Sequence, residues 1–190
     1  MKINTATKIT ILRVLLIPII LLVLLVLAPN SVEFVGHNFY IPYLIALIIY
    51  IVASVSDTVD GHIARSTNTI TNLGKFLDPV ADKLLVNTLL IYFTATGHIP
   101  PLVTILMIGR DTMVDALRMI SVENNVVIAA SKYGKLKTIF QMVSLGLILI
   151  FAYPGIELPN LLNYLIYLTT IISVFSGLDY FIKNKDSLLK

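Results

Sequence analysis

Residues 14–32 read VLLIPIILLVLLVLAPNSV, a run of 19 residues without a single charge. A membrane-spanning helix needs about 20 mainly apolar residues, so this stretch predicts a span. The basic residues before it resemble the start of a signal peptide, but the apolar run is long and no cleavage site precedes Glu33. We therefore expect a retained span. Four more uncharged stretches of similar length follow, at 34–56, 84–109, 138–156 and 158–178.

The overall composition excludes most other classes of protein. Of 190 residues, 57% are hydrophobic and 13% are charged, whereas soluble domains carry about 25% charged residues. A soluble globule, a disordered chain and a fibrous repeat are thereby excluded. A net charge of +3 is too small to indicate a nucleic-acid-binding protein, and the lack of cysteine excludes disulfides and thiolate metal sites. We expect an all-α, polytopic membrane protein with one domain over residues 1–190.

The placement of the cations supports six transmembrane helices. The third uncharged stretch is interrupted by Gly97, Pro100 and Pro101, where one helix should end and another begin. The predicted spans are about 8–28, 41–65, 72–96, 101–122, 135–153 and 158–182. All 14 Lys and Arg residues lie in the N-terminal segment, near 65–83, in 110–137 or after residue 182, and the connections near 29–40, 97–101 and 154–159 contain none. By the positive-inside rule both termini are cytoplasmic, and the lack of a transit segment favours a bacterial cell membrane.

Acidic residues gather at the cytoplasmic ends of the second and third spans. By helical spacing, Asp57 and Asp60 share one face of the second span, and Asp78 and Asp82 share one face of the third. Four carboxylates beside hydrocarbon repel one another and are costly to desolvate. Oxygen ligands of this kind suit Mg²⁺ or Mn²⁺, with room for two ions. The sequence therefore predicts a divalent-metal site at the cytoplasmic face.

Small and basic residues accompany these carboxylates. Gly61, Ala64 and Gly74 would let a substrate approach the helix backbone closely, and Arg65 could hold a phosphate as a planar fork. The whole pattern, D-x2-D-G-x2-A-R-x8-G-x3-D-x3-D over residues 57–82, is called the acidic motif below.

The acidic motif resembles the signature of the CDP-alcohol phosphatidyltransferase family and matches it at all eight fixed positions. The resemblance implies six spans and transfer of a phosphatidyl or related group from a CDP-linked donor to an alcohol. It also implies site residues. Two metal ions would be bound by Asp57, Asp60, Asp78 and Asp82, with Asp82 as the general base for the acceptor hydroxyl. The nucleotide and diphosphate would be lined by Gly61, Ala64, Arg65 and Gly74.

A second part of the resemblance lies before the first span. Family members often carry an N-x2-T-x2-R pattern that contributes to cytidine binding, and the aligned residues here are Thr7, Thr10 and Arg13. Thr7 departs from the pattern because a hydroxyl lacks the paired donor and acceptor of an amide. Thr10 is therefore the expected donor-binding residue of this group, and Arg13 is expected to anchor the span to lipid headgroups.

Further stretches, at 74–83, 109–118 and 126–138, resemble bacterial family members whose acceptor is glycerol 3-phosphate. They imply CDP-diacylglycerol as donor, sn-glycerol 3-phosphate as acceptor, and phosphatidylglycerophosphate and CMP as products. A phosphorylated acceptor requires nearby cations, and the candidates are Arg110, Arg118, Lys135, Lys137 and Lys75. Asp111 and Asp115 are expected to orient the two arginines.

Other functions remain open at this level. Another CDP-alcohol transferase would use inositol phosphate or phosphatidylglycerol as acceptor. A divalent-cation transporter is an alternative from a different class, because carboxylates within a membrane also mark ion pathways. Spans two and three become apolar away from the acidic motif, which argues against a path across the membrane. Ser173 and Gly177 have the spacing of small residues that pack helices, within the chain or in a homodimer.

Overall fold

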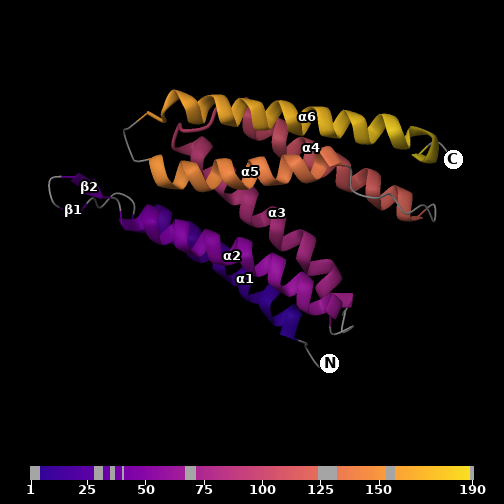
Figure 1. Ribbon diagram of the computed structural model, residues 1–190, viewed down its shortest axis with the longest axis horizontal. Helices are drawn as coiled ribbons and strands as arrows, with labels where there is room; N and C mark the ends of the chain where they lie inside the picture. The colour runs from indigo at the N-terminus through magenta and orange to yellow at the C-terminus, as the bar shows by residue number, and fades with distance from the viewer. Residues whose placement is uncertain are drawn as a thin grey trace. The chain divides into compact units, whose positions relative to one another are not determined.

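The computed structural model describes the backbone of residues 5–27, 32–34, 37–39, 41–66, 72–123, 132–152 and 157–188. Within these ranges, the side chains of 5–6, 32–34, 37–39, 57–66, 72–73, 75–76, 122–123, 132 and 186–188 lie outside the description. Six α-helices account for most of the described residues (Figure 1). Their bounds are α1 Thr5–Leu22, α2 Ile41–Ser66, α3 Asn72–Ala95, α4 Pro101–Glu123, α5 Lys132–Phe151 and α6 Asn160–Leu188.

These helices confirm the all-α class and coincide with the six segments that the sequence predicts, with bounds that differ by a few residues. Two local features depart from the prediction. α1 continues as a π-helix, η1, over Val23–Leu27. In the predicted connection after it, strands β1 (Val32–Phe34) and β2 (His37–Phe39) pair antiparallel, with Val32 opposite Phe39. Strands of three residues are too short to leave a recognisable alternation in the sequence, which explains why the hairpin was not expected.

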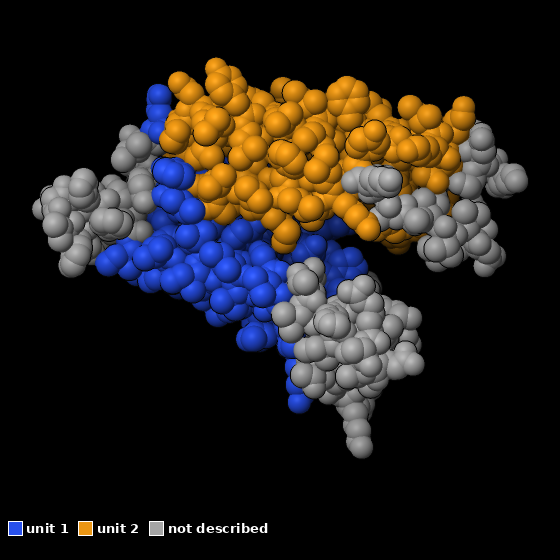
Figure 2. All heavy atoms as spheres, in the orientation of Figure 1, with its two compact units in different colours: residues 1–92, 148–157 blue, residues 93–147, 158–190 orange. Residues whose placement is uncertain are grey.

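The chain divides into two compact units, which are coloured separately in Figure 2. Unit 1 comprises residues 1–92 and 148–157, and unit 2 comprises residues 93–147 and 158–190.

In unit 1, α1 packs along α2 (Figure 1). The buried face of α2 is a stripe at helical spacing, formed by Tyr43, Ala46, Tyr50 and Ala53. The Tyr43 and Tyr92 hydroxyls lie 3.0 Å apart, and Tyr92 also donates to the backbone carbonyl of Leu24 at 3.3 Å. These two bonds tie η1, α2 and α3 together within an otherwise apolar core.

In unit 2, α4 packs along α6, and polar side chains join both helices to α5. Ser144 of α5 and Thr169 of α6 share a hydrogen bond of 3.1 Å, and Gln141 donates to the Met107 sulfur of α4 at 3.8 Å. Such small polar contacts are common between helices in membranes, where apolar side chains gain little by leaving lipid.

The turn between α3 and α4 confirms the helix boundary predicted from Gly97 and the two prolines. Gly97 has a φ of +81°. Its amide donates to Thr94 at 3.1 Å, and the His98 amide donates to Phe93 at 2.8 Å, which together form a Schellman motif that ends α3. Pro101 then opens α4, where its missing N–H costs no helical hydrogen bond.

The outer surfaces of the helices are apolar. Large hydrophobic side chains are exposed on all six, including Leu15, Ile48, Leu84, Ile105 and Phe175. Among the described residues, three segments are long and apolar enough to cross a membrane by composition alone: Thr7–Leu27, Tyr133–Phe151 and Asn160–Lys185. A soluble monomer rarely exposes so much apolar surface, so these features are those of a helical membrane protein.

The positive φ of Gly97 predicts how a substitution there changes the free energy of unfolding. Gly97→Ala should lower the free energy of unfolding by about 1–2 kcal/mol, because a Cβ disfavours the left-handed conformation. Gly109→Ala is the matched control within α4, where a Cβ would meet nothing within 4 Å; it should be neutral or stabilise by about 1 kcal/mol through helix propensity. Thermal unfolding of the purified protein in detergent measures both. Equal effects of the two variants would contradict the assigned turn.

Candidate functional site

The acidic motif begins on α2 and continues on α3. The backbone of α2 is helical through Ser66. By helical spacing, positions 57, 60, 61 and 64 therefore lie on the same face of α2 as the buried Tyr50 and Ala53. The side chains of the predicted site residues Asp57, Asp60, Gly61, Ala64 and Arg65 lie outside the described part of the structure. Their predicted roles therefore remain predictions.

The α3 part of the acidic motif is described in more detail. Gly74 and Ala81 are buried, and Asp78 and Asp82 are half-buried between solvent and core. Since the two aspartates are four residues apart on one helix, their carboxylates share a face. The Thr10 hydroxyl of α1 donates to Oδ1 of Asp78 at 2.6 Å. Thr10 is 1% exposed, so this bond is formed inside unit 1 and fixes α1 to the acidic motif.

Thr10 belongs to a buried polar stripe on α1. Thr7 and Arg13 are also almost fully buried, and the stripe continues along the helix as Ile17 and Ile20. The expectation that Arg13 anchors the span to headgroups is wrong, because only 1% of Arg13 is exposed. Spacings of three and four residues place Arg13 on the inward face of the helix. The predicted contact of Thr10 with the nucleotide stays a prediction, while its contact with Asp78 is a new observation.

The donor chemistry of α3 fits a hard divalent cation. Asp78 and Asp82 supply carboxylate oxygens, and the bond from Thr10 to one oxygen of Asp78 leaves its other oxygen available. The described side chains hold no group of three or more possible metal ligands. Two of the four predicted ligands, Asp57 and Asp60, are not among those side chains, so the full set stays a prediction.

Unit 2 contains a buried charged cluster formed by Arg110, Asp111 and Lys137, called the Asp111 cluster below. Lys137 of α5 donates to both carboxylate oxygens of Asp111, at 2.8 and 2.6 Å. Arg110 donates from Nη1 to Oδ1 of Asp111 at 3.0 Å. The three side chains are 13%, 10% and 5% exposed for Arg110, Asp111 and Lys137, respectively.

The Asp111 cluster carries two positive charges and one negative charge. A buried charge without compensation is costly, so an excess positive charge in this place favours an anionic ligand. The structure thus brings two of the predicted acceptor cations, Arg110 and Lys137, together on one carboxylate. Asp111 has the orienting position that the sequence predicts for it.

Arg110 also contacts α6, through residues that the sequence analysis did not assign to the site. Its Nη2 donates to the Ser176 hydroxyl at 2.7 Å. A Cβ built on Gly177 would lie 2.8 Å from Cγ of Arg110, which shows how closely the two helices approach. Ser173 and Gly177 were predicted to pack helices either within the chain or in a homodimer. Both lie on the α6 surface that packs against α4 within the chain. The small residues at helical spacing on α6 were the sequence signal that could have indicated this contact with Arg110.

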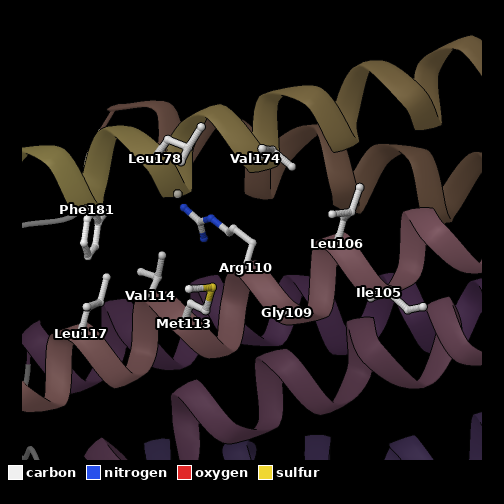
Figure 3. A pocket seen from close by; sticks show the side chains of 11 residues that line it. Ile105, Leu106, Gly109, Arg110, Met113, Val114, Leu117, Val174, Leu178 and Phe181 are labelled. Atoms are coloured by element: carbon white, nitrogen blue, oxygen red, sulfur yellow. The ribbon is translucent and has the colours of Figure 1, made fainter.

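The Arg110 side chain lies in a groove of about 450 Å³ between α4 and α6 (Figure 3). Apolar side chains line most of this groove, among them Ile105, Leu117, Val174 and Phe181. In Figure 3, Arg110 extends from α4 toward α6 and is the one charged side chain among the labelled lining residues.

The remaining predicted cations are placed differently. Arg118 and Lys135 are exposed on α4 and α5. The side chain of Lys75 lies outside the described part of α3. By helical spacing, Arg118 follows Asp111 on one face of α4, two turns later. The structure therefore joins two of the five cations directly and leaves two of them accessible from outside unit 2.

Several known proteins have sequences similar to this chain. The sequence profile of the CDP-alcohol phosphatidyltransferases matches residues 3–175. A Bacillus subtilis protein named CDP-diacylglycerol–glycerol-3-phosphate 3-phosphatidyltransferase is 36% identical over 190 residues, which cover 97% of each chain. The Haemophilus influenzae protein of that name is 34% identical over 100% of this chain and 97% of its own. The one from Mycoplasma genitalium is 39% identical over 63% of this chain and 51% of its own.

The Asp111 cluster predicts a difference between two lysines that are two residues apart. Lys137→Met should lower the free energy of unfolding by about 3–5 kcal/mol, because it breaks a buried ion pair. Lys135→Met is the matched control on the exposed side of α5 and should change stability by about 0.5 kcal/mol or less. Unfolding in detergent, followed by circular dichroism, measures both variants. Similar losses for the two would argue against the buried pair.

Proposed function

Because the chain belongs to the CDP-alcohol phosphatidyltransferase family, we propose that it transfers the phosphatidyl group of CDP-diacylglycerol to sn-glycerol 3-phosphate. The products are phosphatidylglycerophosphate and CMP, in the synthesis of anionic phospholipids. The observation that carries this proposal is the similarity to relatives of that name over almost the whole length of both chains. These named relatives are transferases, which favours an enzyme over the alternative of a cation transporter.

The excess positive charge of the Asp111 cluster supports a phosphorylated acceptor. A guanidinium and an ammonium share the Asp111 carboxylate, and a phosphate would add negative charge that a neutral alcohol cannot supply. Phosphate oxygens match the planar fork of an arginine. We assign the acceptor phosphate to Arg110, Arg118, Lys135, Lys137 and Lys75, with Arg110 and Lys137 held in place by Asp111.

The acidic motif supplies the metal and donor sites of this proposal. Two Mg²⁺ or Mn²⁺ ions would be held by Asp57, Asp60, Asp78 and Asp82. When bound, such ions neutralise the charge of a diphosphate and favour its cleavage. The small residues let the donor approach the backbone, and the donor-binding set is Gly61, Ala64, Arg65, Gly74 and Thr10.

The chain's own residues perform the transfer in one displacement. The Asp82 carboxylate takes the proton from the acceptor hydroxyl. The resulting oxygen attacks the phosphorus that carries the diacylglycerol, and a new P–O bond forms there. The bond from that phosphorus to the bridging oxygen of the diphosphate breaks, and CMP leaves with the electron pair. The acceptor cations orient the reaction by binding the phosphate that does not react.

The proposal places the enzyme in the cell membrane, with six spans, both termini cytoplasmic and the active site at the cytoplasmic face. The apolar outer surfaces of the helices support a membrane location. The positions of the 14 cations support this orientation, since the predicted outer connections contain neither Lys nor Arg.

A panel of acceptors tests the proposed reaction. The purified full chain, with CDP-diacylglycerol and Mg²⁺, should release CMP when sn-glycerol 3-phosphate is added and should release none with glycerol or serine. Inositol phosphate and phosphatidylglycerol complete the panel. CMP release with one of these two alone would overturn the assigned acceptor, and no release with any acceptor would overturn the transferase. Asp82→Asn, the control without the base, should release no CMP.

The bond from Thr10 to Asp78 predicts an effect on metal binding. Thr10→Val should weaken Mn²⁺ binding about 10-fold or more, because partners of ligating carboxylates hold them in position. Thr10→Ser keeps the hydroxyl and should bind as the wild type does. Electron paramagnetic resonance of Mn²⁺ added to the purified protein gives the affinity without any turnover.

Two further variants complete this measurement. Thr112→Val is the control, since that hydroxyl donates only within its own helix, to Ile108 at 2.9 Å. Asp78→Asn, which removes a predicted metal ligand, should lose Mn²⁺ binding. Wild-type affinity in Thr10→Val would refute the positioning of Asp78, whereas wild-type affinity in Asp78→Asn would refute the metal site.

A further inference from the structure

α6 presents small residues to α4 at the level of Arg110. Ser173 and Ser176 are fully buried, and Gly177 follows directly. None of these residues belongs to the acidic motif or to the predicted acceptor cations. These residues let the two helices approach closely, and their contacts with Arg110 can also fix the orientation of its side chain.

Two hydrogen bonds from different helices hold the guanidinium of Arg110. Nη1 donates to Asp111 of its own helix at 3.0 Å, and Nη2 donates to Ser176 of α6 at 2.7 Å. Because the guanidinium is planar, bonds to its two terminal nitrogens fix both its position and the direction of its plane. Figure 3 shows the side chain extending from α4 toward α6.

Gly177 leaves the space through which the side chain passes. A Cβ at this position would lie 2.8 Å from Cγ, 3.6 Å from Nε and 3.8 Å from Cδ of Arg110. Cγ is close to the backbone, so the clash cannot be relieved by moving only the end of the side chain. Rotation nearer the backbone would draw the guanidinium away from Ser176 and Asp111. An alanine at 177 is therefore incompatible with the observed direction of Arg110.

The third nitrogen of the guanidinium, Nε, is the one without an acceptor among the described residues. Nε of Arg110 is buried and has no hydrogen-bond partner among the described residues. A buried donor without an acceptor is unfavourable. A phosphate oxygen that reached Nε would satisfy it, and the net positive charge of the Asp111 cluster favours an anionic ligand of this kind.

We propose that Ser176 and Gly177 are positioning residues that fix the Arg110 guanidinium for the acceptor phosphate. The inference rests on the proposed function and adds α6 to the acceptor site. Ser176 accepts one hydrogen bond, and Gly177 excludes a Cβ that would turn the side chain away. Both residues act through Arg110.

The test compares steady-state kinetics of variants of the full chain. Ser176→Ala and Gly177→Ala should each raise the KM for sn-glycerol 3-phosphate about tenfold, as expected for loss of a charge-assisted hydrogen bond. The KM for CDP-diacylglycerol should stay within about twofold, since that substrate lies outside this contact. Calorimetric binding of sn-glycerol 3-phosphate gives the same comparison for any variant with too little turnover.

Two controls separate positioning from helix packing. Ser173→Ala removes a buried hydroxyl one turn earlier, which has no hydrogen-bond partner in the described part of the chain. Gly109→Ala adds a Cβ in open space beside Arg110. Both should keep the wild-type KM for both substrates.

The outcomes are distinguishable. Unchanged KM values for sn-glycerol 3-phosphate in Ser176→Ala and Gly177→Ala would overturn the inference. A parallel loss of affinity for both substrates, together with a lower unfolding temperature, would also overturn it in favour of helix packing. Arg110→Gln should itself raise the acceptor KM; if it does not, the assignment of Arg110 fails. A wild-type protein that does not use sn-glycerol 3-phosphate would refute the proposed function first.

Discussion

The Asp111 carboxylate is the interaction on which unit 2 depends. It accepts two hydrogen bonds from Lys137 and one from Arg110, and it thereby joins α5 to α4. Arg110 extends the same network to Ser176 of α6. In an apolar helical protein each of these charges is costly alone, so the three helices are held in a register that keeps them paired. The two cations and one carboxylate of the Asp111 cluster carry a net positive charge, which is why we propose that the network binds an anionic ligand in addition to joining the helices.

The same constraint governs unit 1. Among the described side chains, α1 and α3 each carry one inward stripe, which is apolar toward one end and polar toward the other. Thr10 on α1 meets Asp78 on α3 at the polar end, while Tyr43 and Tyr92 share a hydrogen bond nearer the apolar end. The acidic motif therefore continues the helix faces that form the core. When α3 packs through this face, its Asp78 and Asp82 carboxylates lie on the same defined face.

Local signals in the sequence were sufficient for most of the fold. Apolar stretches predict the six helices, and Gly97 with two prolines predicts the turn before α4, because each signal acts over one or two helical turns. The hairpin and the burial of Arg13 were not predicted. For the site, Asp111 was expected to orient the arginines, but Ser176 and Gly177 were not assigned, since they lie 66 and 67 positions beyond Arg110 in the sequence. Such contacts depend on the choice of helices that pack together, and the local sequence pattern does not encode that choice.

We propose that the net positive charge of the Asp111 cluster binds the phosphate of the acceptor. Isothermal titration calorimetry tests it directly, with purified protein, Mg²⁺ and either sn-glycerol 3-phosphate or glycerol as titrant. We expect the wild type to bind sn-glycerol 3-phosphate and not glycerol, and Arg110→Gln to bind the phosphorylated alcohol at least about tenfold more weakly. Equal affinity of the wild type and Arg110→Gln for sn-glycerol 3-phosphate would contradict the claim.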